Sequence, residues 1–261
     1  MKFYKYQALG NDFILIDNRE KIFDAQPEYV SFLCNRHFGI GADGLMLVEN
    51  CDDADFKMQF FNSDGSVATM CGNGSRCIVA FAHRLGIFKN EVIFASGAGK
   101  HSGAVLSENK NSLEIKVKIT DVNRIERGDG YYFINTGVPH CVIFKDNIND
   151  VDINTEGKKW RYCSLFPEGA NVNFVEICSS NRLKLATFER GVEGETLACG
   201  TGATASAIAV FDKLQNDITN YEIVTKGGVL KISFDTDKTQ KDSFVNIWLQ
   251  GATTLVFEGI I

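Results

Sequence analysis

The chain has 261 residues, of which 44% are hydrophobic, and carries a formal net charge of −6 at pH 7. This length forms one large domain or two of about 100–150 residues, with enough apolar side chains for buried cores. The acidic balance argues against nucleic acid or an anionic membrane surface as a partner. No apolar run reaches the roughly 18 residues that cross a bilayer, and residues 1–6 lack a signal-peptide core, so we expect a cytoplasmic protein.

The periodicity of apolar residues predicts a β-rich chain with few helices. Strands are predicted at residues 13–16, 45–48, 56–61, 92–95, 113–119, 131–134, 141–144, 172–177, 183–188, 229–234, 244–249 and 254–257. Helices are predicted at residues 28–36, 75–85, 153–160 and 202–214. Charge and glycine interrupt the pattern at residues 121–130, where we expect the boundary between two domains.

The two halves of the chain repeat one pattern. Gly10 precedes Cys71 by 61 positions, and Gly137 precedes Cys199 by 62. Further matches pair residues 10–15 with 137–142, 56–61 with 183–188, and 92–103 with 223–228. Repeats this long indicate duplicated domains. We therefore predict two homologous halves, residues 1–120 and 121–250, with residues 251–261 returning to the first half.

Two of the eight cysteines stand apart from the others. Cys71 and Cys199 each begin a polar, glycine-rich turn that an apolar helical run follows. A thiol there faces unpaired N–H groups and the positive end of the helix dipole, which favour a thiolate and an incoming carboxylate. Ordinary buried packing is predicted for the thiols at positions 34, 77, 141, 163 and 178. Because no C-x-x-C pair occurs, we expect no zinc ribbon and no thioredoxin motif.

Residues 39–44 match the dinucleotide fingerprint G-x-G-x-x-G. That motif requires a strand before it and a helix after it. Here a predicted helix precedes the glycines and a predicted strand follows them. The order therefore argues against nucleotide binding. The turn after Cys199 also fits the looser form of the fingerprint and does open a helix, where a carboxylate satisfies the same N–H groups as a phosphate.

A set of short motifs spans the chain in a fixed order. They are Gly10-Asn11-Asp12-Phe13, Phe61-Asn62-Ser63-Asp64-Gly65-Ser66, Cys71-Gly72-Asn73-Gly74, Pro139-His140-Cys141-Val142, Asn171-Val172-Asn173-Phe174, Glu189-Arg190-Gly191 and Ala198-Cys199-Gly200-Thr201-Gly202. Together they resemble the diaminopimelate epimerase family, over residues 3–260. The resemblance implies an isomerase that interconverts LL- and meso-2,6-diaminopimelate for lysine and peptidoglycan synthesis, with no pyridoxal phosphate or other cofactor and no metal.

The resemblance also implies the fold and the site. The fold is α/β, of the α+β type, with two pseudo-symmetric domains, each a barrel-like sheet around a central helix, an active site in the cleft between them, and a homodimer as the assembly. The catalytic pair is Cys71 and Cys199, and His140 and Glu189 tune or deprotonate these thiols. The substrate-binding residues are Asn11, Asn62, Gly72, Asn73, Asn171, Glu189, Arg190, Gly200 and Thr201.

The chemistry of the residues agrees with that resemblance. Inverting an α-carbon without a cofactor requires one group that removes a proton from one face and another that delivers a proton to the opposite face. A cysteine has a reference pKa of about 8.5, so a thiol and a thiolate can coexist near neutrality. Helix N-termini would bind the carboxylate and stabilise the charge that develops.

The chain departs from the family pattern at four positions. Val138 replaces a common Asn, Gly44 replaces a Gln of some members, Glu193 is an insertion, and Phe257 stands where some members have an interfacial Tyr. None of these changes concerns the thiols, but they leave recognition of the distal end of the substrate open.

Alternative interpretations remain at this point. A proline racemase or hydroxyproline epimerase shares the two-cysteine logic, but such enzymes usually read Cys-Gly-His-Gly where this chain has Asn73. A non-catalytic anion-binding or redox-sensing protein would use the two thiols as a regulatory disulfide. Among single residues, His140 could be a hydrogen-bonded interior histidine, Glu189 and Arg190 a surface ion pair, and Asn62 and Asn171 simple turn residues.

Overall fold

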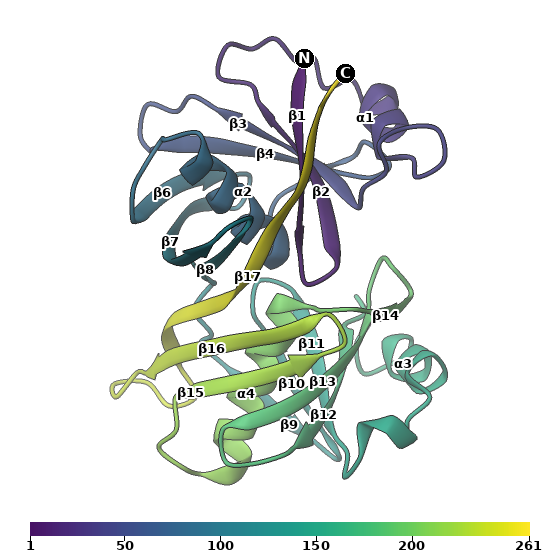
Figure 1. Cartoon of the computed structure of the whole chain (residues 1–261). Coiled ribbons are helices and arrows are strands. Elements are labelled where there is room, and N and C mark those ends of the chain that lie inside the picture. The colour runs from purple at the N-terminus through teal and green to yellow at the C-terminus, as the bar shows by residue number, and fades with distance from the viewer. The chain divides into compact units, whose positions relative to one another are not determined.

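The computed structural model describes residues 1–261. The chain divides into two compact units, Met1–Val117 with Gly251–Ile261 (unit 1) and Lys118–Gln250 (unit 2). In each unit the strands curve around one helix (Figure 1). No helix of the structure is both long enough and apolar enough to span a membrane.

Unit 1 is a closed sheet around α2. Its elements are β1 (Lys2–Ala8), β2 (Asn11–Asp17), α1 (Pro27–Cys34), β3 (Gly44–Glu49), β4 (Phe56–Asn62), β5 (Val67–Ala68), α2 (Gly72–Arg84), β6 (Glu91–Ser96), β7 (Gly99–Asn109), β8 (Ser112–Lys118) and the last part of β17 (Phe244–Ile260). β2 pairs with β1 and, in parallel, with β3, and β4 pairs with β3 and, in parallel, with β6. β6, β7 and β8 follow as antiparallel neighbours. β17 pairs with both β8 and β1, which closes the sheet.

Unit 2 repeats this connectivity around α4. Its elements are β9 (Ile125–Gly128), β10 (Tyr131–Asn135), β11 (Pro139–Phe144), η1 (Ile148–Asp150), α3 (Ile153–Arg161), β12 (Asn171–Ile177), β13 (Arg182–Glu189), β14 (Gly194–Thr196), α4 (Gly200–Leu214), β15 (Asn220–Thr225), β16 (Gly228–Thr236) and the first part of β17. β11 lies antiparallel to β10 and parallel to β12, and β13 lies antiparallel to β12 and parallel to β15. A bridge between Val122 and Phe244 joins the start of this unit to β17. The duplication expected from the sequence is therefore present in the topology.

The central helices are buried because their first turns are built from small residues. Residues 72–82 of α2 are all buried, and so are residues 202–210 of α4. At Gly74 an added Cβ would lie 2.1 Å from Met46 Cε, and at Gly202 it would lie 2.3 Å from Asn173 Oδ1. Glycine therefore lets the start of each helix approach the surrounding sheet closely. This close approach places the residue before each helix at the end of the barrel.

Several sequence predictions differ from the structure. β1, β5, β7, β9, β14 and β15 were not predicted. Apolar residues are sparse in β7, β9 and β14, where pairing with neighbours makes the strand, whereas β1 and β15 do carry aromatic or β-branched residues. Residues 244–249 and 254–257 form one continuous strand, β17, since the chain pairs without a break as it leaves unit 2 for unit 1. The prediction that Cys178 is buried is wrong: it lies exposed in the turn after β12, and Cys163 is only half-buried.

The central helix of unit 1 gives a test of the packing. Phe81 on α2 is fully buried, with its ring centroid 4.8 Å from that of Tyr4 and 6.1 Å from that of Tyr6. Phe81→Ala should lower the free energy of unfolding by about 3–5 kcal/mol, because it leaves a cavity inside the barrel. Phe38→Ala, at a ring that is 79% exposed, should change it by less than about 0.5 kcal/mol. Urea denaturation of both variants measures the difference, and equal losses would contradict the enclosed position of α2.

Candidate active site

Cys71 and Cys199 are the N-cap residues of the two central helices. Each has an extended backbone, with φ −145° at Cys71 and φ −119° at Cys199. The Gly74 N–H donates to Cys71 Sγ at 3.5 Å, and Cys199 Sγ lies 3.5 Å from Thr201 Oγ1. Both helices begin earlier than predicted, so the turns after the thiols are already helical. The first N–H groups of each helix, at residues 72–74 and 200–202, therefore come directly after a cysteine, at a helix N-terminus that can bind an anion.

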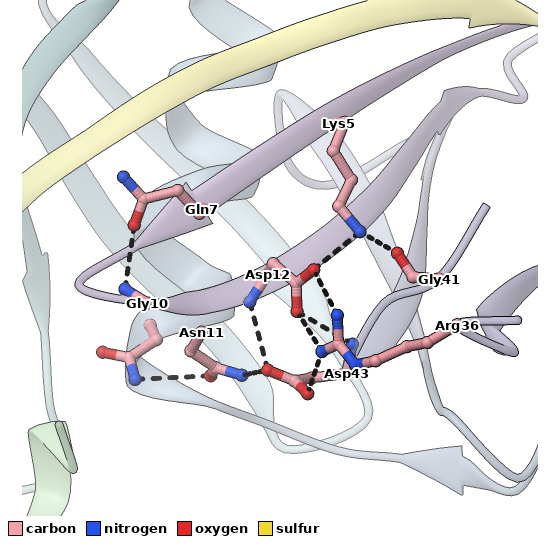
Figure 2. Close-up of polar contacts among 9 residues, drawn as sticks. Lys5, Gln7, Gly10, Asn11, Asp12, Arg36, Gly41 and Asp43 are labelled. Carbon is pink, nitrogen blue, oxygen red and sulfur yellow. Dashed lines mark hydrogen bonds and ion pairs between the residues drawn. The ribbon is translucent and has the colours of Figure 1, made fainter. Parts of the chain in front are cut away.

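In unit 1, Asn11 contacts the thiol and is hydrogen-bonded to Asn73. Asn11 Oδ1 lies 3.7 Å from Cys71 Sγ and accepts a hydrogen bond from Asn73 Nδ2 at 3.3 Å. Asn11 Nδ2 donates to Asp43 Oδ2 at 2.6 Å (Figure 2). Because a carboxylate only accepts, this contact fixes the amide of Asn11 with its oxygen toward Cys71. The sequence-predicted residues Asn11, Asn73 and Cys71 thus form one cluster.

Behind Asn11 lies a network of four charged side chains, shown in Figure 2. Arg36 binds Asp12 through both of its terminal nitrogens, at 2.7 and 3.1 Å, and Asp43 Oδ1 at 2.8 Å. Lys5, which is buried, donates to Asp12 Oδ2 at 2.7 Å and also to the Gly41 carbonyl. Burial by itself raises the pKa of Asp12, but hydrogen bonds from Arg36 and Lys5 outweigh it and lower the pKa to about 2.

The glycine loop at residues 39–44 is part of this support. The N–H groups of residues 39–42 donate to carbonyls of residues 33–35, at the end of α1. An added Cβ at Gly39 would lie 2.0 Å from the Phe32 carbonyl oxygen, so the loop packs directly on the helix. Because its amide groups are already paired, the loop has the wrong geometry to hold a phosphate.

In unit 2, His140 is fully buried and bound to Asn173. Asn173 Nδ2 lies 3.0 Å from His140 Nδ1 and donates to the Cys141 carbonyl at 3.3 Å, while Asn173 Oδ1 accepts from Thr187 at 3.0 Å. Since a carbonyl can only accept, the orientation of the Asn173 amide is settled. His140 Nδ1 is therefore an acceptor, and the proton of the neutral ring is on Nε2.

The environment keeps His140 neutral. Burial, reinforced by the positive charge of Arg190, lowers its pKa to about 3 despite the hydrogen bond from Asn173. The buried Nε2–H has no hydrogen-bond partner. An unpartnered buried donor is costly, and it is ready for an acceptor such as a carboxylate or a thiolate. Of the possibilities open from the sequence, the structure supports a hydrogen-bonded interior histidine that retains one unused donor.

Asn171 and Arg190 are joined in the same unit. Asn171, at the start of β12, is buried beside His140 in the parallel pairing of β11 and β12. Its Oδ1 accepts from the Arg190 N–H at 2.8 Å. The Arg190 guanidinium donates to the Glu168 carbonyl at 3.1 Å, so it fastens the loop that leads into β12. Glu189, the last residue of β13, is held by backbone pairing with β14.

The residues expected to recognise the distal end of the substrate do not form a hydrogen-bonded cluster like the one around Cys71. Asn62 is exposed at the end of β4, where its Nδ2 donates to Ser66 Oγ at 3.0 Å within the turn. A side chain at Gly44 would begin 2.6 Å from the Phe61 carbonyl oxygen, so the backbone here leaves no room for the Gln of other members. Val138 is half-buried before β11. Asn62 therefore acts as a turn residue in this structure.

Two residues near the thiols were missed from the sequence. Asn173 lies two residues after Asn171, and alternation along a strand places both side chains on one face. Arg76 follows Cys71 by five positions and is fully buried, which no sequence pattern indicated. No group of three or more His, Cys, Asp or Glu side chains is arranged to hold a metal ion.

Solved structures share this fold. A phenazine biosynthesis protein of the PhzF family from Bacillus anthracis matches with a TM-score of 0.78 and 13% identity, over 100% of this chain and 99% of that chain. A probable proline racemase from Agrobacterium radiobacter matches with a TM-score of 0.71 and 13% identity, over 100% and 92% of the two chains. These likenesses define the fold class as the two-unit, barrel-like α/β fold expected from the sequence.

The sequence comparisons identify the family. The family model described as diaminopimelate epimerase matches residues 3–125 and 132–249. A diaminopimelate epimerase of Flavobacterium psychrophilum is 47% identical over 100% of both chains, and one of Aquifex aeolicus is 42% identical over 99% of this chain and 97% of its own. The chain belongs to the diaminopimelate epimerase family, which confirms the resemblance drawn from its motifs.

The charged network predicts a pH-dependent contribution to stability. Because the pKa of Asp12 is lowered from 3.8 to about 2, its ion pairs should stabilise the fold by about 2 kcal/mol above pH 4. That contribution is lost as the pH falls from about 4 to about 2. Asp12→Asn should therefore unfold more easily than wild type in urea at pH 7, and this difference should shrink steadily as the pH falls from about 4 toward 2. Asp52→Asn, in an exposed loop, is the control, and a pH-independent effect of Asp12→Asn would contradict the assignment.

The hydrogen bonds of His140 predict one tautomer. Because its pKa is about 3, the ring should stay neutral and protonated on Nε2 at pH 5.5 in two-dimensional nitrogen–proton NMR spectra. In Asn173→Ala the donor to Nδ1 is absent, so the Nδ1–H tautomer should become populated. An imidazolium at pH 5.5 in the wild-type protein would refute this electrostatic description.

Proposed function

We propose that the chain is a diaminopimelate epimerase that converts LL-2,6-diaminopimelate into meso-2,6-diaminopimelate in lysine and peptidoglycan precursor synthesis. The observation that carries the proposal is the duplicated thiol: Cys71 and Cys199 cap the central helices of two barrels with the same connectivity. Full-length identity of 47% to the Flavobacterium psychrophilum epimerase supports the substrate.

In the proposed mechanism the two thiols are the two acid–base groups. Residues 1–120 with 251–261 supply Cys71, and residues 121–250 supply Cys199. One cysteine, as thiolate, takes the α-proton, and the electron pair stays on the carbon and its carboxylate. The other cysteine, as thiol, then delivers its proton to the opposite face and becomes the thiolate. Atoms and charge balance, because the carbon exchanges one proton for another and the thiols exchange protonation states.

The remaining site residues would bind and orient the substrate. The N–H groups of Gly72, Asn73, Gly200 and Thr201 lie at the helix N-termini, where they would hold the α-carboxylate and stabilise the carbanion. The unpartnered Nε2–H of His140 offers a further donor. We propose that Asn11, Asn62, Asn171, Glu189 and Arg190 hold the amino and distal groups. Asn62 would first have to leave its contact with Ser66.

No cofactor takes part in this proposed chemistry, because the acid and the base are both side chains of the protein. We also propose a cytoplasmic homodimer. Phe257 on β17, at the position of an interfacial Tyr in some members, is 46% exposed and packs on Phe3 with 6.0 Å between ring centroids. It would provide apolar surface for a second copy.

The reaction is tested with LL-diaminopimelate in deuterated water and purified protein without additives. The meso product should carry solvent deuterium at the inverted α-carbon, because the delivered proton comes from a thiol that exchanges with solvent. Proline and hydroxyproline serve as comparison substrates and should not be inverted. Inversion only after addition of pyridoxal phosphate or a metal ion would refute the proposal.

Single replacements separate the two acid–base groups. Cys71→Ser or Cys199→Ser should lower epimerisation by at least about 10²–10⁴-fold, since a serine hydroxyl is a far weaker base at neutral pH. With an analogue that bears a halide on the β-carbon, proton removal alone permits elimination. Each single variant should then eliminate halide from one stereoisomer, and the double variant from neither. Cys178→Ser, at an exposed thiol, is the matched control. Two single variants that both react with the same stereoisomer would rule out opposed thiols.

A further inference from the structure

Arg76 is a buried cation one helical turn below Cys71. It lies on α2 with no exposed surface. Its Nη1 donates to the Gly72 carbonyl at 3.2 Å and its Nη2 to Asn73 Oδ1 at 2.9 Å, while Nε has no partner. Burial lowers the pKa of this guanidinium from 12.5, but arginine remains charged inside proteins. A buried charge whose hydrogen bonds go to neutral oxygens is costly, so its position calls for a functional reason.

The hydrogen bond of Arg76 orients Asn73 and, through it, Asn11, which contacts the thiol. Because Nη2 can only donate, the oxygen of Asn73 must face Arg76, and its Nδ2 is directed to Asn11 Oδ1. At the far end, Asp43 can only accept from Asn11 Nδ2. With the Arg76 guanidinium at one end and the Asp43 carboxylate at the other, the amides of Asn73 and Asn11 can each have only one orientation. The Asn11 oxygen is held at 3.7 Å from Cys71 Sγ as a result.

We propose that Arg76 is a positioning residue for Cys71: it fixes the Asn73 and Asn11 amides in one direction and places a permanent positive charge beside the thiolate. The positive charge of Arg76 and a thiolate at Cys71 attract each other electrostatically. Attraction to a buried cation favours the thiolate, whereas the Asn11 oxygen accepts from the thiol form. Arg76 thus stabilises the thiolate of Cys71 and Asn11 stabilises the thiol, as suits a group that gains and loses a proton in each turnover.

Unit 2 lacks this cation. Thr204 follows Cys199 by five positions, as Arg76 follows Cys71, and its Oγ1 donates to the Gly200 carbonyl at 3.1 Å. The carbonyl of the residue after the cysteine thus accepts a hydrogen bond from a neutral hydroxyl in α4 and from a guanidinium in α2. The two thiols are therefore electrostatically different within similar helices, and Arg76 should act on Cys71 in particular.

Other charged groups of unit 1 near α2 do not provide this effect. Asp12 and Asp43 are paired with Lys5 and Arg36 in the network behind Asn11. Cys77, on α2, is fully buried, and burial raises its pKa, so it stays a neutral thiol. The carboxylate of Glu114 on β8 acts on Arg76 and would support its charge. Arg76 is thus the cation whose removal should be felt at Cys71.

The test measures the reactivity of Cys71 without any turnover. The inference rests on the proposed acid–base role of Cys71, yet the readout does not depend on which substrate the enzyme takes. Iodoacetamide labels thiolates, and mass spectrometry of peptides gives the labelling rate of Cys71 from pH 5 to 10. In Arg76→Met the midpoint of this pH profile should rise by about one unit, a tenfold loss of thiolate below the midpoint. The Cys199 profile in the same samples should not move.

Matched variants separate charge from packing. Arg76→Lys keeps the charge and should keep the midpoint close to wild type, and Thr204→Val removes the equivalent side-chain contact of α4 and should leave the Cys71 profile unchanged. If Arg76→Met does not fold, Arg76→Gln takes its place, because it also removes the charge. The inference is overturned if the neutral variants retain the wild-type midpoint, or if Arg76→Lys shifts it as far as they do. Failure to epimerise diaminopimelate, with these shifts present, would instead count against the proposed function alone.

Discussion

The N-terminus of a helix enclosed by a closed sheet is the constraint on which this protein depends. A buried helix must satisfy its first N–H groups where it emerges, because water does not reach them along its length. In both units that place is occupied by a cysteine in an extended conformation. The barrel therefore encloses the helix and leaves a cysteine as the N-cap residue at its start.

The two units use the same backbone for different polar chemistry. Met46 Cε faces Gly74 of α2, whereas Asn173 Oδ1 faces Gly202 of α4. This one difference lets unit 2 build the Asn173–His140 contact, for which unit 1 offers no counterpart at that position. Unit 1 instead places Arg76 inside its barrel. The two units thus share the position of the thiol, while the polar side chains inside the two barrels differ.

Rigidity around the first thiol comes from charges rather than from apolar packing. Asn11 is held by Asp43, Asp43 by Arg36, and Arg36 by Asp12, which also binds the buried Lys5. Each side chain in this series limits the orientation of the next. Such a series of charge-assisted hydrogen bonds favours one orientation of the Asn11 amide. The glycine loop that resembles a nucleotide motif contributes the Gly41 carbonyl to this support.

Local patterns in the sequence determined the family, the repeat, the central helices and the two cysteines that precede them. These features depend on apolar periodicity and on short motifs, which can be recognised without knowledge of the fold. The polar strands β7, β9 and β14 could not be predicted in this way, because pairing with neighbouring strands, rather than their own residues, makes them strands.

Burial and hydrogen-bond direction were decided by the tertiary structure alone. The sequence singled out Asn11, Asn73 and His140 as candidate site residues but could not orient their polar atoms, which depend on Asp43, Arg76 and Asn173. It offered no sign that Arg76 is buried while Cys178 is exposed. A residue type sets which chemistry is available, but only packing sets how much water, and which charge, surrounds it.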